Sequence, residues 1–423
     1  MKKLILGFAS LLTIITLASC NGGKSKEFKP SLDINTECSI KVVGDYGNFE
    51  ALVDEFDKFN VYYPNVELSY KKVDNYKNNL SVVLDGNDKP NIFFSYTWMM
   101  ASDKYNSVIS HMENLSDSKL NINLDCIRES LISRNDNKVL MAPVFSKSYG
   151  MLINNDLFKN NDIDIPSNYN ELINVCNSFK EKNIKSPIMG YTKKSDSSLM
   201  NTIAYPLFVA TIANNKEAIN LANNLDPQAG EYTRSALTKV DSLVKAGCFD
   251  FAECDKIDDN YEKVLLRFLE GDVPMMVCAG DTPSGIKKRI DKSESYTKSP
   301  FSYSFSPIPL TDDGGYFIDS PSVEFSVNKD CDNLDMTNEF MRFLISEIEL
   351  NAMASAKGLI SPTKVMSFDS MYSPFANIPA DRTISPELIG VKDPLANQIR
   401  VASYKVGKGE LTVDEAISQY GNF

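Results

Sequence analysis

The sequence predicts an α/β protein with two lobes, on the grounds of its length and the order of its elements. The chain has 423 residues, roughly two to three times the length of a typical domain, so two packed bodies are expected. Apolar segments near its start follow one another as strand, helix, strand, helix and strand. This is the order of a parallel, doubly wound sheet with right-handed crossovers. With 43% hydrophobic and 24% charged residues, the chain can bury a substantial core.

The first sheet is expected to begin near Cys38, with a short strand that stops at Gly44. Apolar residues then recur at three- and four-residue steps from Phe49 to Phe59, behind Asn48 as a candidate N-cap, which predicts an amphipathic helix. The same unit continues with a strand at Val66–Tyr70, a helix around Leu80–Leu84 that Gly86 closes, and a strand at Ile92–Phe94.

A second unit is expected after Pro143, starting with a strand at Tyr149–Ile153. A helix follows with Ser167 or Asn168 as its cap and an apolar face that extends to Phe179. Further elements are expected at Tyr261–Phe268 (helix), Pro274–Ala279 (strand), Pro321–Val327 (strand), Asp335–Ala356 (helix) and after Thr412, which forms a capping box with Glu415.

Charge and histidine content disfavour several classes of function. Lys and Arg total 44 against 56 for Asp and Glu, a net charge of −12 that repels nucleic-acid backbones, so no nucleic-acid partner is expected. The chain has one histidine, His111, so one subunit cannot assemble a three-histidine metal site. No metal or cofactor is predicted, and His111 is interpreted as a structural or surface residue.

The amino terminus has the pattern of a secretory signal. Lys2 and Lys3 precede an apolar run that ends at Leu17, too short for a membrane span of about 20 residues. The sequence Leu17-Ala18-Ser19-Cys20 resembles a bacterial lipobox. We therefore expect a signal peptide at 1–19, a lipid-anchored Cys20 and a flexible tether over 20–37, with the protein outside the cytoplasm. An ordinary secretory signal with a chance cysteine is the alternative.

The other cysteines show no CxxC spacing, so neither a metal ribbon nor a thioredoxin-like site is predicted. Cys248 and Cys254 are close enough in sequence for a small-loop disulfide, but buried free thiols are an equally open interpretation.

An ordered series of segments resembles the family-1 extracellular solute-binding proteins of ATP-binding-cassette (ABC) importers, the group that contains maltose-type sugar receptors. Each segment is mostly packing and capping chemistry, so their order and spacing carry the resemblance. After the lipobox, the matching segments are Phe49–Pro64, Pro90–Phe94, Pro143–Phe158, Ile165–Glu171, Phe268–Met276 and Asn338–Ser346.

This resemblance implies a type II periplasmic-binding-protein-like fold, in which hinge strands link two α/β lobes. Lobe 1 would comprise 38–144 and 305–345, and lobe 2 would comprise 145–304 and 346–423. A ligand would lie between them, where loops at the carboxyl ends of strands converge. The implied partners are a small solute and a membrane permease, and the protein is expected to be a monomer that binds and does not catalyse.

Sugar recognition needs hydrogen-bonding side chains for hydroxyl groups and flat aromatic rings for pyranose faces. Loop positions and the family pattern predict these cleft residues: Asp45, Tyr46, Tyr96, Thr97, Trp98, Lys147, Tyr149, Asp281, Thr282 and Ser320, with Ser322 as a weaker candidate. Asp281 and Thr282 stand where sugar-binding relatives commonly carry a tryptophan, which weakens transfer of a maltose-like specificity.

Each of these residues also has a purely structural interpretation. Trp98 can be a packing residue, Asp45 a helix cap, Lys147 a solvated hinge charge and Tyr149 a core residue.

The functional hypothesis is a lipid-anchored receptor that captures a mono- or oligosaccharide by hinge closure and delivers it to a permease. A receptor for peptides or cationic solutes is the alternative on the same fold, favoured by Asp281 and the acidic balance. A surface glycoside hydrolase is an alternative of another class, since two carboxylates suffice for that chemistry. An adhesin or structural lipoprotein is disfavoured because the sequence lacks repeats.

Overall fold

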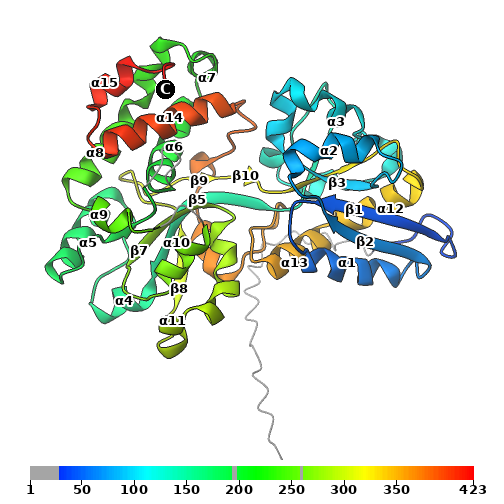
Figure 1. Cartoon of the computed structure of the whole chain (residues 1–423), viewed down its shortest axis with the longest axis horizontal. Helices are drawn as coiled ribbons and strands as arrows, with labels where there is room; N and C mark the ends of the chain where they lie inside the picture. The colour runs from blue at the N-terminus through cyan, green and yellow to red at the C-terminus, as the bar shows by residue number, and fades with distance from the viewer. Residues whose placement is uncertain (1–27, 193–197, 258–260) are drawn as a thin grey trace, which may run out of the picture.

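The α/β elements form two lobes that lie side by side, joined by strands β5 and β10 (Figure 1). The structure is a computed structural model that describes residues 28–192, 198–257 and 261–423. The predicted signal peptide and Cys20 lie outside these ranges. Below, lobe 1 means residues 28–145 and 323–359, and lobe 2 means residues 146–322 and 360–423 of the described chain, because separate hydrophobic cores fill these two sets.

The sheet of lobe 1 has the order β2-β1-β3-β11-β4. Its strands β1, β2 and β3 run parallel, as the alternation of strands and helices predicts. Strand β11 runs antiparallel to both β3 and β4, which the sequence pattern did not indicate. The strands are β1 (Cys38–Gly44), β2 (Val66–Lys72), β3 (Ile92–Ser95), β4 (Ala142–Pro143) and β11 (Glu324–Val327).

Amphipathic helices cover this sheet with their apolar sides. Helix α1 buries Leu52, Phe56 and Phe59, as its spacing predicts. The predicted cap is wrong: Phe49 occupies the N-cap position, and the Asn48 side-chain amide donates to Glu50 Oε1 at 2.9 Å. The helices are α1 (Glu50–Asn60), α2 (Tyr76–Asp85), α3 (Asn106–Ser110), α12 (Leu334–Leu344) and α13 (Glu347–Lys357).

The helical stretch expected at 335–356 is divided into α12 and α13. Ser346 breaks it, because its side chain accepts a hydrogen bond from the Glu349 amide as the N-cap of α13. Gly358 then ends α13 in the left-handed conformation, φ 69°, which glycine adopts without steric cost.

Strand β5 is the centre of the lobe 2 sheet. It pairs antiparallel with β7, β8 and β10, while β6 pairs parallel with β7. At Gly150 the strands approach so closely that a Cβ atom would lie 2.5 Å from the Ser306 carbonyl oxygen. The strands are β5 (Ser146–Asn154), β6 (Ile188–Met189), β7 (Met275–Gly280), β8 (Tyr303–Ser306) and β10 (Ser320–Pro321), with β9 (Phe317–Ile318) and β12 (Thr383–Ile384) as a separate pair.

Helices of lobe 2 surround this sheet. Asn168 caps α5, accepting from the Glu171 amide, and Thr412 and Glu415 form the predicted capping box of α15. The helices are α4 (Asn155–Asn160), α5 (Tyr169–Glu181), α6 (Ser198–Ile212), α7 (Lys216–Asn223), α8 (Arg234–Lys245), α9 (Phe251–Cys254), α10 (Tyr261–Phe268), α11 (Glu294–Lys298), α14 (Asp393–Gly407) and α15 (Val413–Ser418).

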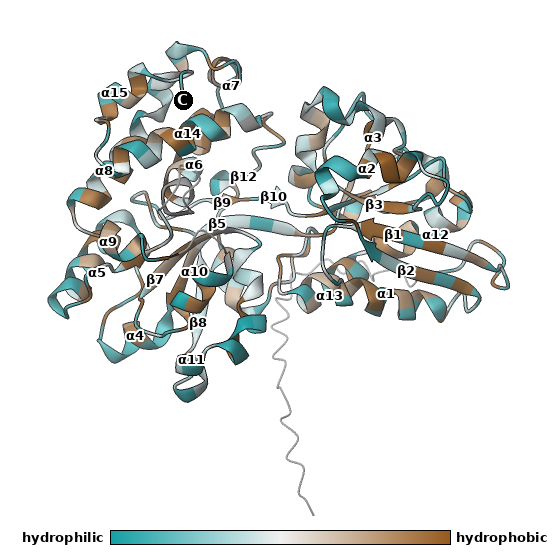
Figure 2. Cartoon of the chain, viewed as in Figure 1, coloured by the Kyte–Doolittle hydropathy of each residue, from teal (hydrophilic) through white to brown (hydrophobic). Residues whose placement is uncertain are grey.

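The hydrophobic cores divide the chain at other positions than the expected lobe boundaries. Phe305 and Leu310, expected in lobe 1, pack in the cores of lobe 2 because β8 pairs with β5. Leu350 and Met353 of α13, expected in lobe 2, pack in the core of lobe 1 against α1. Figure 2 shows hydrophobic residues concentrated on strands such as β1 and β3, inside the helical layers.

The segment expected as a flexible tether up to residue 37 is instead bound to lobe 1 from residue 28 onward. Ser31 donates to both carboxylate oxygens of Glu339, from its amide at 2.8 Å and from its hydroxyl at 2.7 Å. Arg342 donates to the Lys29 carbonyl at 2.6 Å, and the Phe28 ring meets Phe343 edge-on at 5.3 Å. Residues 20–27 lie outside the described ranges.

The described cysteines, Cys248 and Cys254 among them, are free thiols. Burial raises the pKa of Cys254, so its thiol stays protonated and behaves as a small apolar side chain. No helix of the described residues is long and apolar enough to cross a membrane.

A buried ion pair joins the segments that cross between the lobes. Arg128 of lobe 1 donates from Nε and Nη2 to the two oxygens of Asp319, at 2.8 Å each, and Asp319 is fully buried. Arg128 Nη1 donates to the carbonyls of Ser361 and Thr363. The Ser146 hydroxyl donates to Asp319 at 2.6 Å. The crossings at residues 144–146, 319–323 and 358–361 therefore share one polar centre.

Removing Arg128 should destabilise the protein strongly. Arg128→Ala leaves the Asp319 carboxylate buried without its cation, which costs about 3–5 kcal/mol. Arg134→Ala is the matched control, because Arg134 pairs with Glu129 at an exposed position, and such pairs contribute at most about 1 kcal/mol. Urea unfolding measures both differences in free energy. Equal losses for the two variants would contradict this prediction.

Candidate functional site

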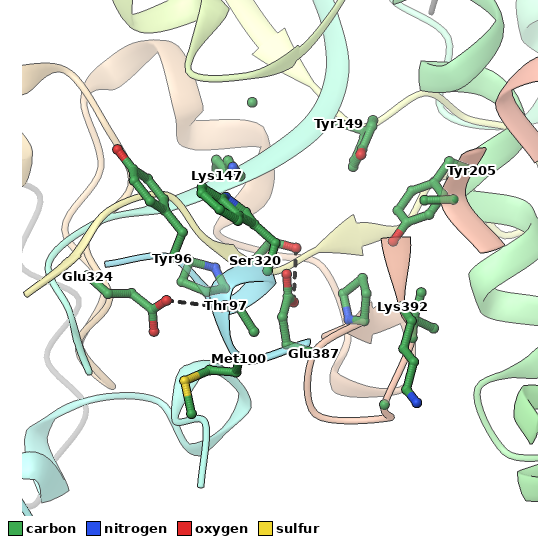
Figure 3. Close-up of a pocket in the computed structure, with 17 residues that line it drawn as sticks. Tyr96, Thr97, Met100, Lys147, Tyr149, Tyr205, Ser320, Glu324, Glu387 and Lys392 are labelled. Carbon is green, nitrogen blue, oxygen red and sulfur yellow. Dashed lines mark hydrogen bonds between the residues drawn. The ribbon is translucent and has the colours of Figure 1, made fainter. Parts of the chain in front are cut away.

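A cavity of about 750 Å³ lies between the lobes, along the crossing strand β5. Its lining comes from the segment after β3, from β5 and α6, from the β10–β11 region and from the residues that lead into α14 (Figure 3). The chemically informative residues that line it are Tyr96, Thr97, Trp98, Lys147, Tyr149, Tyr205, Ser320, Glu324, Glu387 and Lys392.

Two pairs of aromatic rings line this cavity, one from each lobe. Tyr96 and Trp98 of lobe 1 are stacked, with ring centroids 5.4 Å apart and planes 12° apart. Tyr149 and Tyr205 of lobe 2 lie 5.0 Å apart with a tilt of 40°. Figure 3 shows the two tyrosines of lobe 2 together, separated from Tyr96 by the cavity. Flat, rigid surfaces of this kind bind apolar faces of a ligand with little loss of side-chain entropy.

Glu324 is a buried carboxylate in the wall of this cavity. Its side chain is 1% exposed, and Oε2 accepts a hydrogen bond from the Thr97 hydroxyl at 3.0 Å. Its other oxygen, Oε1, is buried without a hydrogen-bond partner in the structure. Burial raises the pKa of Glu324 to about 8, partly offset by Thr97 and by the positive charge of Lys147.

A second carboxylate, Glu387, lines the same cavity from the segment before α14. The hydroxyls of Ser320 and Ser385 donate to its Oε2 at 3.2 and 3.4 Å, and burial raises its pKa. Lys147 and Lys392 line the cavity as well. The cavity therefore presents two acidic and two basic side chains beside its aromatic rings.

A second cavity of about 550 Å³ shares Lys147 with the first and contains three of the predicted residues, Tyr46, Asp281 and Thr282. Asp281 connects the lobes here, because it accepts a hydrogen bond from the Tyr46 hydroxyl of lobe 1 at 3.5 Å. It also accepts from the Ser322 hydroxyl, at the end of lobe 2, at 2.6 Å. Burial, followed by the Asp281 carboxylate, raises the pKa of Tyr46, so Tyr46 remains a neutral hydrogen-bond donor.

The structure brings the predicted cleft residues to one region between the lobes. Tyr96, Thr97, Trp98, Lys147, Tyr149 and Ser320 line the larger cavity, and Tyr46, Asp281 and Thr282 line the smaller one. Asp45 lines neither cavity, but its Oδ1 accepts from the Tyr96 hydroxyl at 2.9 Å, so Asp45 orients a ring that does. The alternative role of Asp45 as the cap of α1 does not hold, since no side chain caps that helix.

Sequence reasoning missed four of the polar or aromatic residues that line the larger cavity: Tyr205, Glu324, Glu387 and Lys392. Glu324 had a readable signal, because it is a charged residue between Val323 and Phe325 in a strand expected to be buried. Tyr205 lies in the apolar helix α6, and Glu387 and Lys392 lie in a segment without periodicity, so their positions depend on tertiary structure alone.

The cleft provides groups for binding and lacks the sole histidine. His111 lies on lobe 1 instead, where its ring nitrogens are 2.8 Å from Asp330 and 3.0 Å from Asp85. In the described part of the chain, no group of three or more His, Cys, Asp or Glu side chains is arranged to hold a metal ion.

The family model described as bacterial extracellular solute-binding protein matches residues 43–349. No functionally curated protein shows a significant sequence match to the chain.

Solved structures of such proteins share the fold at low sequence identity. A family 1 extracellular solute-binding protein from Bifidobacterium longum subsp. infantis has a TM-score of 0.65 at 15% identity and covers 91% of this chain and 98% of its own. RafE from Streptococcus pneumoniae has a TM-score of 0.69 at 14% identity, and the match covers 94% of this chain and 99% of RafE. A sugar transporter from Bacillus licheniformis in complex with stachyose has a TM-score of 0.60 at 15% identity, and the match covers 90% of this chain and 99% of the transporter chain.

The pKa of Glu324 predicts how its replacement changes stability with pH. A carboxyl group whose pKa rises from 4.5 in the unfolded chain to about 8 in the folded chain destabilises the fold increasingly as pH rises through that window. The free energy of unfolding of Glu324→Gln should therefore rise relative to that of wild type between pH 5 and pH 8. The total rise should be a few kcal/mol, because each pKa unit corresponds to ~1.4 kcal/mol. Urea unfolding at several pH values measures this, and a difference that stays constant with pH would contradict it.

Proposed function

The chain belongs to the bacterial extracellular solute-binding protein family, and on this premise we propose that it captures a mono- or oligosaccharide between its lobes. The observation that carries the proposal is the pair of aromatic platforms, Tyr96 with Trp98 and Tyr149 with Tyr205, which reach one cavity from both lobes. A volume of about 750 Å³ falls within the usual range for small-molecule sites.

The polar groups between these platforms suit sugar hydroxyls. Hydroxyl groups donate and accept at once, so they can pair with carboxylate oxygens and with an ammonium group in the same site. Glu324, Glu387 and Lys147 supply these groups around the rings. A site that alternates flat apolar surfaces with hydrogen-bonding groups matches the two kinds of surface on a pyranose ring.

Binding would proceed by closure of the lobes around the ligand. The walls of the cavity belong to different lobes, and narrow segments such as β5 and β10 connect them. A ligand that contacts both walls binds the closed form more tightly than the open form. The difference between these two binding free energies sets how far the equilibrium shifts toward closure. The proposal includes no chemical step, so the saccharide leaves unchanged.

A cationic solute is the second candidate, because Glu324 and Glu387 place two carboxylates in the cavity. Lys147 and Lys392 line the same cavity and balance that charge. A cation receptor needs carboxylates whose charge is not balanced by nearby lysines. The described residues of this cavity do not form such a cluster, so the saccharide is favoured.

Delivery to an ABC permease and attachment through Cys20 complete the proposed function. The family relationship supports the permease as partner, and the Leu17-Ala18-Ser19-Cys20 motif supports the lipid anchor. Anchoring outside the cytoplasm would keep the receptor close to the transporter that it loads.

Saccharide binding should be measurable with purified protein. We expect one or more members of a panel of mono- and oligosaccharides, including stachyose, to bind in calorimetry and to lower the radius of gyration in X-ray scattering, because closure brings the lobes together. Peptides and polyamines serve as the comparison set. Binding that is confined to the comparison set, or cleavage of a bound oligosaccharide, would reject the proposal.

Replacing Cys20 should release the protein from the membrane. In cells that lipidate secreted proteins, we expect wild-type protein in the membrane fraction, labelled by a fatty acid, and Cys20→Ala in the soluble fraction without label. Cys38→Ala is the matched control, since Cys38 lies in strand β1 of lobe 1 and should keep the wild-type distribution. Membrane retention of labelled Cys20→Ala would refute the assignment.

A further inference from the structure

We infer that Glu324 determines ligand specificity by accepting a hydrogen bond from one saccharide hydroxyl through its Oε1 atom. This inference rests on the proposed function and adds to it the residue of lobe 1 that selects the ligand.

The position of Glu324 supports this role. It is the first residue of β11, where the chain enters lobe 1 after the crossing at 319–323, and its side chain reaches the cavity opposite the tyrosines of lobe 2 (Figure 3). Thr97 fixes the carboxylate by donating to Oε2 at 3.0 Å. Oε1 then has no hydrogen-bond partner and is closed off from solvent in this structure, so a ligand hydroxyl would reach it only as the cavity wall adjusts on closure. A buried acceptor in that state is costly unless a donor arrives.

Other buried carboxylates of the chain show that the fold can supply such donors. Glu339, also buried, receives hydrogen bonds from Ser31, Tyr63 and Arg342 on its two oxygens. Asp319 is likewise satisfied on both oxygens. Glu324 differs from these two residues in two ways. One of its oxygens has no hydrogen-bond partner, and its side chain lines a cavity large enough for a ligand.

The charges around Glu324 indicate which donor fits. Thr97 donates to it, Lys147 adds a positive charge nearby and Glu387 adds a negative one. A hydroxyl group meets Oε1 without adding charge. A sugar hydroxyl can donate to Glu324 when it is ionised and accept from it when it is protonated, whereas a ligand carboxylate can pair only with the protonated form. The preference for neutral sugars over uronic acids should therefore strengthen as pH rises through the pKa of Glu324, about 8.

Glu55 provides a matched control. It is also 1% exposed, has one unpartnered carboxylate oxygen and has a pKa that burial raises to about 8. Glu55 lies on α1 beside Lys58 and Glu349 and lines none of the cavities described above. Glu55→Gln therefore reproduces the loss of a buried carboxylate without touching the cleft.

The test measures saccharide affinity by calorimetry for wild type, Glu324→Gln and Glu55→Gln. At pH 9, where the Glu324 carboxylate is ionised, we expect Glu324→Gln to bind the preferred saccharide about 10- to 100-fold more weakly, the usual effect of losing a hydrogen bond to a charged group. Glu55→Gln should bind within about twofold of wild type. Thermal melting and circular dichroism establish that both variants fold.

A series of singly deoxygenated saccharides makes the test independent of the variant's stability. Wild type should lose affinity about tenfold or more for one deoxy analogue, and that loss should shrink in Glu324→Gln, because the two changes remove the same bond. Unchanged saccharide binding by Glu324→Gln, or an equal loss for that analogue in both proteins, overturns the inference and leaves the proposed function intact. Absence of saccharide binding by wild type overturns the proposed function and this inference with it.

Discussion

The contact between Arg128 and Asp319 is the constraint on which the two-lobed arrangement depends. Asp319 is fully buried and accepts hydrogen bonds from Arg128 of lobe 1 and from Ser146 in the crossing at 144–146. Arg128 also donates to the Ser361 carbonyl in the crossing at 358–361. A guanidinium group suits this role because its planar set of donors fits a carboxylate on one side and carbonyl oxygens on the other. The crossings are thereby held together at one point.

The cleft follows from this arrangement. Strand β5 carries Lys147 and Tyr149 away from the crossing, and the loop after β3 brings Tyr96 and Trp98 toward them from the other lobe. Each lobe therefore contributes a pair of aromatic rings and a carboxylate, Glu324 from lobe 1 and Glu387 from lobe 2. The two walls still differ chemically, because both lysines that line the cavity, Lys147 and Lys392, belong to lobe 2.

Much of lobe 1 was predictable because β1, α1, β2, α2 and β3 follow one another with clear periodicity. The residues directly after β1 and β3 were predictable as cleft residues because parallel strands end at one edge. The two-residue strands β4, β9 and β10 have no periodicity to read, and residues 305–310 were misassigned because only pairing of β8 with β5 places them. Glu387 and Lys392 reach the cavity from a distant segment, so their contribution depends on tertiary packing that no local pattern encodes.

The attachment of residues 28–31 to α12 bears on how the protein would be anchored. Ser31 is held by Glu339, and the Lys29 carbonyl by Arg342, so the start of the described chain is fastened to one body only. These contacts involve α12 and none of the segments that cross between the lobes. In a receptor anchored through Cys20, as we propose, lobe 1 would be the body held near the membrane, and closure would move lobe 2 relative to it.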